Sequence, residues 1–179
     1  MATKHADTHD LEKMERWQQG LKGELETRFP VCAIFLASGE DQLSHDIFRK
    51  FRKSFEKRDA GFHHLIIFGQ HGISTAVIGF LEHLDLPLGS LPYLGIATDV
   101  GAREITLFKL PPGAHPCPAP ALERDKNLEK PWQTILDRVE SAVDTGSTSV
   151  DLAGISGEST VSLNEKSLTG LVESLLKMA

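Results

Sequence analysis

The fold of this chain is decided by residues 62–84, FHHLIIFGQHGISTAVIGFLEHL. Four apolar residues at 65–68 are typical of a short strand that is buried on both faces. Gly69 and Gly72 then interrupt the pattern, and apolar residues return with helical spacing as far as Leu84. A strand, a glycine-containing loop and a helix in this order form half of a βαβ crossover, so the stretch predicts a parallel pair of strands.

The composition indicates an α/β domain with short extensions. The chain has 179 residues, of which 40% are hydrophobic, which is enough to bury a proper core. No apolar run reaches the roughly 18 residues that span a bilayer, and the polar, charged start of the chain is unlike a secretory signal. We therefore expect a cytoplasmic protein without membrane contacts. The net charge of −6 argues against nucleic acid as the main partner.

Upstream of this stretch, the sequence predicts a disordered tail over residues 1–9 and a helix capped by Asp10. A buried strand over 31–37 and a second helix over 42–57 follow. The polar side of the second helix carries a basic run of Arg49, Lys50, Arg52, Lys53, Lys57 and Arg58. We expect this face to be solvated, with docking of an acidic protein or a phosphorylated ligand as the alternative.

Downstream, residues 93–97 and 104–110 read as two further strands. Their connection is short, so they should pair as an antiparallel hairpin. Residues 111–120 contain five prolines and predict an exposed loop. A helix then carries an apolar face from Pro131 and is closed by Gly146.

The end of the chain predicts a linker followed by one more helix. Residues 147–160 are small and polar, and they read as a linker or a weak hairpin. Asn164 is a natural cap for the last helix, with Leu163 and Leu168 placed as a hydrophobic staple. The expected division is a disordered tail over 1–9, an α/β domain over 10–146, and a linker with a C-terminal helix over 147–179. We expect that helix to pack on the domain or on a partner.

The order of the elements from residue 31 to residue 144, β-α-β-α-β-β-α, resembles the thioredoxin fold, including its leading helix. In that family a proline, usually cis, directly precedes the third strand, and Pro92 stands there before Tyr93. The C-terminal helix would be an addition to this core. A flavodoxin-like or other small Rossmann-like sheet is the alternative that the element order leaves open.

The resemblance also implies what is missing. Redox-active thioredoxin-like proteins carry Cys-x-x-Cys in the turn after the first strand, and here residues 38–41 read Ser-Gly-Glu-Asp. Dithiol exchange is therefore not expected at this turn. Cys32 falls inside the predicted strand, where a cysteine usually behaves as a small hydrophobe, and Cys117 lies in the proline-rich loop. The resemblance thus implies a non-redox role.

The best candidate for a ligand-binding loop is residues 69–75, GQHGIST. Its glycines allow close backbone approach, Ser74 and Thr75 offer hydroxyls, and the following helix would present free amides to an anion. His71 is a residue that can bind phosphate or act as a general base. The simpler interpretation is a strand-to-helix turn with Ser74 as the N-cap.

Further residues should gather around this loop, because the loops after parallel strands leave the same edge of a sheet. Ser38, Glu40 and Asp41 should therefore lie near His71, although Ser38 lacks the G-x-S-x-G elbow of a nucleophilic serine. Helix capping by Ser38 or Asp41 is the better explanation. Together with the residues of the third strand, the candidate ligand-binding set is Ser38, Asp41, His71, Ser74, Thr75, Pro92 and Tyr93.

The eight histidines of the chain do not predict a metal site. His63 and His64 are adjacent and would face opposite sides of a strand, while His5 and His9 fall in the expected tail. We expect no metal, no cofactor and no catalytic residue. The function that the sequence favours is a protein-interaction or assembly module, with another protein or a second copy as partner. The alternative is a protein or enzyme that binds a small anionic ligand through residues 69–75.

Overall fold

The computed structural model describes residues 4–23, 29–98, 101, 103–110, 126–163 and 166–178. These residues form a mixed α/β structure with a five-stranded mixed sheet and five α-helices. In chain order the elements are α1 (Lys4–Gly23), β1 (Cys32–Leu36), α2 (Gln42–Glu56), the 3-10 turn η1 (Phe62–His64), β2 (Leu65–Phe68), α3 (Thr75–His83), the 3-10 turn η2 (Leu88–Ser90), β3 (Tyr93–Ala97), β4 (Glu104–Lys109), α4 (Lys126–Asp144), β5 (Glu158–Ser162) and α5 (Leu168–Met178).

The strands lie in the order β2-β1-β3-β4-β5. β1 and β2 are parallel, with Leu36 opposite Phe68, and every other neighbouring pair is antiparallel. Residues 62–84 form the predicted strand and helix, and β2 is parallel to β1 through the β1–α2–β2 crossover. The crossover that α3 was expected to make between parallel strands is not found, because α3 leads to β3, which is antiparallel to β1. The antiparallel hairpin of β3 and β4 is confirmed. The Leu91–Pro92 peptide bond, directly before β3, is cis.

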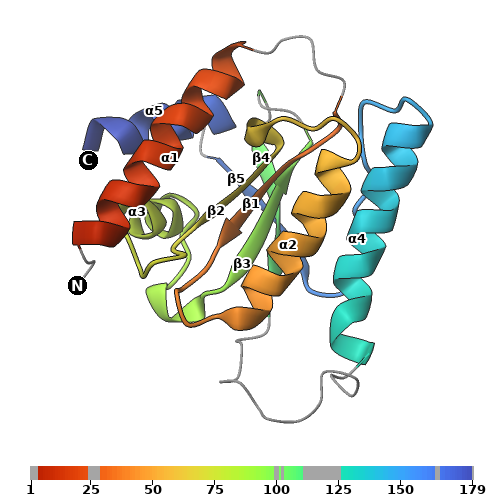
Figure 1. Cartoon of the computed structure of the whole chain (residues 1–179), viewed down its shortest axis with the longest axis horizontal. Coiled ribbons are helices and arrows are strands. Elements are labelled where there is room, and N and C mark those ends of the chain that lie inside the picture. Colours follow the sequence, from red (N-terminus) through yellow and green to blue (C-terminus); the bar gives the residue numbers. More distant parts are fainter. Residues whose placement is uncertain are drawn as a thin grey trace.

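The sheet separates two layers of helices (Figure 1), with α2 and α4 over one face and α1, α3 and α5 over the other. Side chains of β1 alternate between these layers, as the pleat of a strand requires. Phe35 belongs to the apolar cluster under α2 and α4, whereas Ile34 and Leu36 belong to the cluster under the other three helices. Both faces of β1 are therefore buried, which explains its unbroken apolar sequence.

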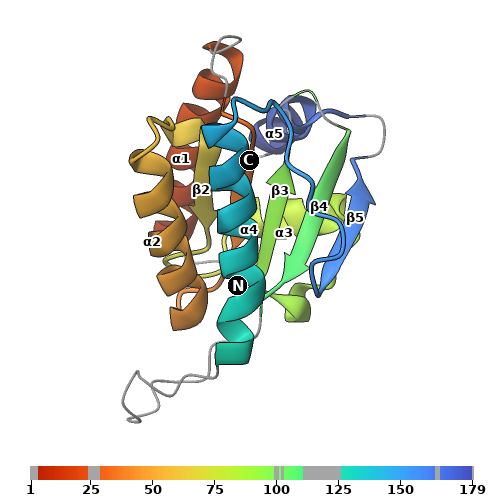
Figure 2. The ribbon, with the colours of Figure 1, turned by 90° about the vertical axis from the view of Figure 1, so that its right-hand side faces the viewer.

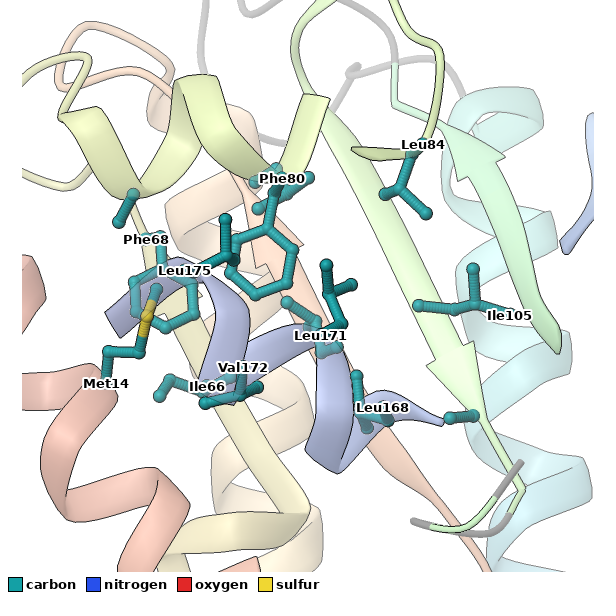
Figure 3. Packing of buried hydrophobic residues seen from close by; sticks show 14 of the residues in the cluster. Met14, Ile66, Phe68, Phe80, Leu84, Ile105, Leu168, Leu171, Val172 and Leu175 are labelled. Atoms are coloured by element: carbon teal, nitrogen blue, oxygen red, sulfur yellow. The ribbon is translucent and has the colours of Figure 1, made fainter. Parts of the chain in front are cut away.

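The apolar face of α5 is buried within the chain (Figure 3). Leu168, Leu171 and Val172 are at most 2% exposed, and they pack among side chains of α1, α3 and the sheet. A Cβ atom added at Gly79 of α3 would lie only 2.5 Å from Leu175 Cδ2, so α3 and α5 lie in close contact. Of the two predicted positions for the C-terminal helix, on the domain or on a partner, the structure therefore shows the first. Leu163 is buried in the same cluster as Leu168.

Two boundaries differ from the prediction. α1 begins at Lys4, so described residues of the expected tail are helical, and Asp10 lies inside the helix instead of capping it. The physical reason is tertiary, since Ala6 is 1% exposed and Asp10 is held by the loop before α3. β5 occupies part of the expected linker and extends past it, because backbone pairing with β4 forms this strand without an apolar side-chain pattern.

The paired histidines and the ends of α4 also test the predictions. His63 and His64 lie in η1 instead of a strand, and their rings are 3.8 Å apart, so the expectation that they face opposite ways is wrong. Gly146 closes α4 with a positive φ of 68°, as expected, although the helix begins before Pro131. Asn164, Cys117 and the proline-rich residues 111–120 lie outside the described residues. Among the described helices, none is long and apolar enough to cross a membrane.

Candidate functional site

The two loops predicted to meet at one edge of the sheet do meet. Ala37 N donates to Phe68 O at 3.1 Å, at the point where β1 and β2 end. A Cβ atom at Gly39 would lie 3.2 Å from Gln70 O, which shows how closely the turn at 38–41 approaches the loop at 69–75. The turn that contains Ser38 and Asp41 therefore lies against the loop that contains His71, whereas a shared ligand site of these residues stays a prediction.

Capping accounts for the polar residues at the two helix starts. Asp41 Oδ1 accepts a hydrogen bond from Ser44 N at 3.3 Å, and Asp41 Oδ2 accepts one from Ser44 Oγ at 2.6 Å. Ser74 Oγ accepts from Val77 N at 3.2 Å, so Ser74 is the N-cap of α3. Ser38 contributes through its carbonyl oxygen, which accepts from Asp41 N and lies 3.3 Å from His45 Nε2. The capping predicted for Asp41 and Ser74 is thus confirmed, whereas the contacts of Ser38 use its backbone carbonyl and not its hydroxyl.

The loop at 69–75 already holds two carboxylates, and both come from α1. Asp10 Oδ2 accepts from Gly69 N at 2.8 Å and from Ser74 Oγ at 2.6 Å, and the Asp10 side chain is almost completely buried. Asp7 Oδ1 accepts from Thr75 N at 2.7 Å. The carboxylates thus occupy positions at the positive end of α3 where an external anion would bind. Ligand binding at Thr75 and its neighbours stays a prediction. The Ser74 hydroxyl and the Thr75 amide, which were expected to bind the ligand, already donate to Asp10 and Asp7.

Lys13 completes this arrangement from one turn further along α1. Its ammonium lies 3.1 Å from Asp10 Oδ1 and donates to Gln70 Oε1 at 3.2 Å and to the carbonyl oxygen of Ile67. Burial lowers the pKa of Lys13, although the neighbouring carboxylate of Asp10 acts in the opposite direction. Asp7, Asp10 and Lys13 are three residues apart on one face of α1, and that spacing is the sequence signal for their shared role.

Gly69 is required by the geometry of the loop. Its φ of 83° lies in the left-handed region, and a Cβ atom there would be 1.9 Å from Ala37 O. Any larger residue would push the ends of β1 and β2 apart. The glycine therefore permits close packing of two strand ends, independently of any ligand.

His71 is exposed and lies beside two histidines of α1. Its ring centroid is 4.3 Å from that of His9 and 5.1 Å from that of His5. Partial desolvation, together with the nearby His9 and His5, lowers the pKa of His71. Within the described part of the chain, no group of three or more His, Cys, Asp or Glu side chains is arranged to hold a metal ion.

The residues of β3 complete the predicted set. Pro92 is buried, and its carbonyl oxygen accepts from Leu110 N at 3.0 Å. Tyr93 lies opposite Leu36, so it stands close to the turn at 38–41, and the ammonium of Lys109 lies 4.6 Å from its ring centroid. The structure therefore brings Pro92 and Tyr93 to the same end of the sheet as Ser38.

Cys32 is unsuited to thiol chemistry. The side chain is 2% exposed, and burial raises the pKa of its thiol to about 12. Its Sγ donates to the carbonyl oxygen of His63 at 3.0 Å, and the indole nitrogen of Trp17 donates to the same oxygen at 3.1 Å. A thiolate is the reactive form of cysteine, so this residue is held in its inert form. Its predicted burial is confirmed.

The basic side of α2 takes part in local ion pairs. Arg49 pairs with Asp46 at 2.7 Å, Arg52 pairs with Glu56 at 2.7 Å, and Arg58 pairs with Asp144 of α4. The arginines at 49 and 52 are more than 60% exposed, as expected of a solvated helix face. Arg52 also lines a groove between α1 and α2.

Comparisons with protein-family models, with curated proteins and with solved structures give no match for this chain. Its function must therefore be argued from its own geometry. The end of the sheet around residues 38 and 69–75 is held together by capping and by carboxylates of α1, so its polar groups serve mainly to join α1 to the sheet.

Proposed function

We propose that this chain is a non-redox, thioredoxin-like assembly module that pairs with a second copy of itself through β5. A parallel βαβ unit followed by an antiparallel hairpin and a helix supports the thioredoxin-like part of this proposal. Pro92, directly before β3, supports it as well. The turn at 38–41 contains no cysteine, which supports a role other than dithiol exchange.

The outer edge of β5 is the observation that carries the assembly role. β5 is the last strand of the sheet (Figure 2), and no described strand lies beyond it. All of its residues are exposed except Val161, which is partly buried. An open strand edge presents hydrogen-bonding groups to which another strand can pair, and natural proteins often protect such edges with lysine or proline. The sequence of β5, ESTVS, contains neither.

The pairing of β5 with β4 shows which backbone groups point outward. Leu163 N donates to Arg103 O at 2.7 Å, so these opposed residues form a hydrogen-bonded pair. Such pairs alternate along an antiparallel ladder, which makes Val161 and Ser159 the next residues bonded to β4. The N–H and C=O groups of the remaining residues, above all Thr160, are therefore directed away from the sheet.

A two-fold axis through Thr160 would pair these outward groups without conflict. Thr160 would lie opposite Thr160 of the second copy, and Ser162 opposite Glu158. No two like charges would face each other, and opposed threonines are a favourable pair in antiparallel sheets. Glu158 N already donates to Ile155 O at 3.2 Å, so the amides of Thr160 and Ser162 would form the new bonds.

The other surfaces expected from the sequence are less suited to assembly. The apolar face of α5 is buried against α1 and α3. Among the described residues, the exposed large apolar side chains are Phe62, Leu88 and Met178, which belong to three different elements. A contiguous apolar patch is the usual mark of a hydrophobic interface. Backbone pairing at β5 needs no such patch.

Sedimentation velocity of the whole chain tests this proposal, over concentrations from about 1 μM to 1 mM because a short strand pair makes a small interface. We expect the mass to rise toward twice the 19.7 kDa of one chain. Thr160→Lys and Thr160→Glu should each remain monomeric, because each places two like charges opposite one another at the axis. Mixing the two variants should restore the dimer, since the charges are then complementary.

The matched control is Ser156→Lys, which adds the same charge in the exposed turn before β5 and should leave the dimer intact. A wild-type chain that stays monomeric at every concentration contradicts the proposal. So does a Thr160→Lys variant that still dimerises, because the contact would then lie elsewhere.

A further inference from the structure

A groove lies at the opposite edge of the sheet, where α1 and α2 flank β2. Its volume is about 390 Å³, within the range of small-molecule sites. Leu65, Ile66 and Ile67 of β2 line the groove, together with side chains of α1 and α2 and of the segment before β2. Figure 2 shows β2 at the same end of the sheet as these two helices, far from β5. The groove is therefore separate from the proposed dimer contact.

The charged residues around this groove are mostly cationic. Lys13 and Arg16 enter from α1 and Arg52 from α2, whereas Glu56 is the one carboxylate among its lining residues. Glu56 already pairs with Arg52 at 2.7 Å, and Lys13 is paired with Asp10. Because the chain as a whole is acidic, this local excess of positive charge is a specific feature of the groove.

Arg16 is the cation with the greatest capacity to bind a ligand. Its guanidinium lies 4.0 Å from the centroid of the Phe62 ring, which holds it in place by a cation–π contact. Among the described residues, no carboxylate forms an ion pair with it. A guanidinium presents a planar set of donors that matches a carboxylate or phosphate, so Arg16 is suited to receive one.

Aromatic side chains provide the apolar part of the lining. Phe48 and Phe55 come from α2, and Phe62, which is 39% exposed, comes from η1. A large aromatic side chain at the surface beside a cation is a common feature of sites for partly apolar ligands. The groove thus combines aromatic and apolar lining residues with three cationic side chains.

Extended peptides fit this edge poorly, in contrast to the edge at β5. Ile66 and Ile67 are 1% and 2% exposed, and the carbonyl oxygen of Ile67 already accepts a hydrogen bond from Lys13. A strand could not pair with β2 without displacing that side chain. A small molecule that remains above the strand requires no such displacement.

We infer that this groove binds a small organic anion, with its carboxylate or phosphate on Arg16 and Arg52 and an apolar ring or chain against Phe48 and Phe62. This inference rests on α1, α2 and β2, so it stands whether or not β5 forms a dimer. The loop at 69–75 borders this groove through Gln70, while the groups proposed to hold the anion come from α1 and α2.

Nuclear magnetic resonance titration tests the inference with 1-naphthaleneacetate as the probe and its neutral amide, 1-naphthaleneacetamide, as the matched ligand. We expect the carboxylate to shift the amide signals of residues lining the groove and to bind at least about tenfold more tightly than the amide, because charge-assisted hydrogen bonds are the stronger ones. Arg16→Gln and Arg52→Gln should each weaken binding several-fold.

Arg49→Gln is the control, since Arg49 belongs to the same helix and a similar ion pair but does not line the groove. It should bind the probe as the wild type does. Three results would overturn the inference: equal binding of the acid and the amide, equal losses in all three variants, or no shifts in the groove at millimolar probe. Arg16, Arg49 and Arg52 are exposed, so the variants should keep the native fold, which the unshifted remainder of the spectrum verifies.

Discussion

The two edges of the sheet expose their backbones to very different degrees. At one edge, β2 is apolar and nearly inaccessible, with every residue at most 7% exposed, and Lys13 of α1 donates to the outer carbonyl oxygen of Ile67. At the other edge, β5 is polar and exposed, and its outward amides lie free of β4. An open edge can accept another strand, whereas the edge of β2 is covered by side chains of α1.

The difference originates in α1. This helix reaches the end of β2 with Asp10 and Lys13, which bond the backbone of the strand and of the loop that follows it. Among the described residues, no helix donates a side-chain hydrogen bond to the outer edge of β5. The side-chain hydrogen bonds at this strand are those of Glu158 to the turn before it. The covered edge therefore depends on a few buried polar contacts, and the predictions that follow test how much each edge contributes to stability.

The largest effect is expected from Asp10→Ala. Asp10 is buried, accepts two hydrogen bonds and neutralises Lys13, so its removal leaves an uncompensated cation at the covered edge. Loss of one member of a buried ion pair typically costs about 3 to 5 kcal/mol. Urea unfolding of the variant should show a loss of this size.

The double variant Asp10→Ala, Lys13→Met is the control, because it also removes the cation that Asp10→Ala leaves unpaired. The double variant should recover part of the lost stability, as expected when two side chains interact directly. A single-variant loss below about 1 kcal/mol would mean that the covered edge does not depend on this contact.

An intermediate effect is expected from acid, and it should act on the same edge. His64 precedes β2, and burial together with the neighbouring His63 lowers the pKa of His64 from 6.5 to about 4. The folded state therefore binds its proton less readily than the unfolded state, so stability falls as the pH decreases below 6.5. The loss should reach about 1.4 kcal/mol per pH unit at most for this one group.

Unfolding free energies measured from neutral pH to about pH 5 give this slope, in the range where an ordinary histidine titrates. His64→Gln should reduce it. His71→Gln, at an exposed histidine whose pKa is also lowered, should reduce it less because the group is not buried. An unchanged slope in His64→Gln would assign the acid sensitivity to other residues.

The smallest effect is expected at the open edge, from Glu158→Ala. Like Asp10, Glu158 accepts two backbone hydrogen bonds, from Gly154 N at 3.1 Å and from Ile155 N at 3.4 Å. It is exposed, so water can replace the carboxylate, and the loss should be about 0.5 to 1 kcal/mol. The same urea experiment measures it at low protein concentration, where the proposed dimer dissociates. A loss as large as that of Asp10→Ala would remove the contrast between the two edges.

The sequence predicts most of the core because its apolar periodicity is strong there. β2 has the parallel partner and β3 and β4 form the hairpin that were expected, since burial on both faces of a strand leaves a continuous apolar run. The direction of β3 relative to β2 carries no such signal. β5 cannot be predicted from apolar periodicity, because Glu158–Ser162 is held by backbone pairing and exposes most of its side chains. A polar strand resembles a polar linker when only the sequence is known.

The candidate site is predictable in part for a related reason. Capping by Asp41 and Ser74 depends on residues three apart, and local spacing reveals it. Asp10 bonds Gly69, far along the chain, and a contact of that kind leaves no periodic signal. Arg16 and Phe48 line one groove only because α1 and α2 flank the same strand, which requires the tertiary structure.

The contact between α1 and α5 has a consequence for synthesis of the protein. Met14 of α1 is fully buried beside Val172 and Leu175 (Figure 3), so part of the covering of the first helix is made by the last one. A ribosome adds about 5 to 20 residues per second, so many seconds separate the two helices during translation. In that interval the nascent chain exposes the apolar surface around Met14 and Phe80, which is the kind of surface that chaperones bind.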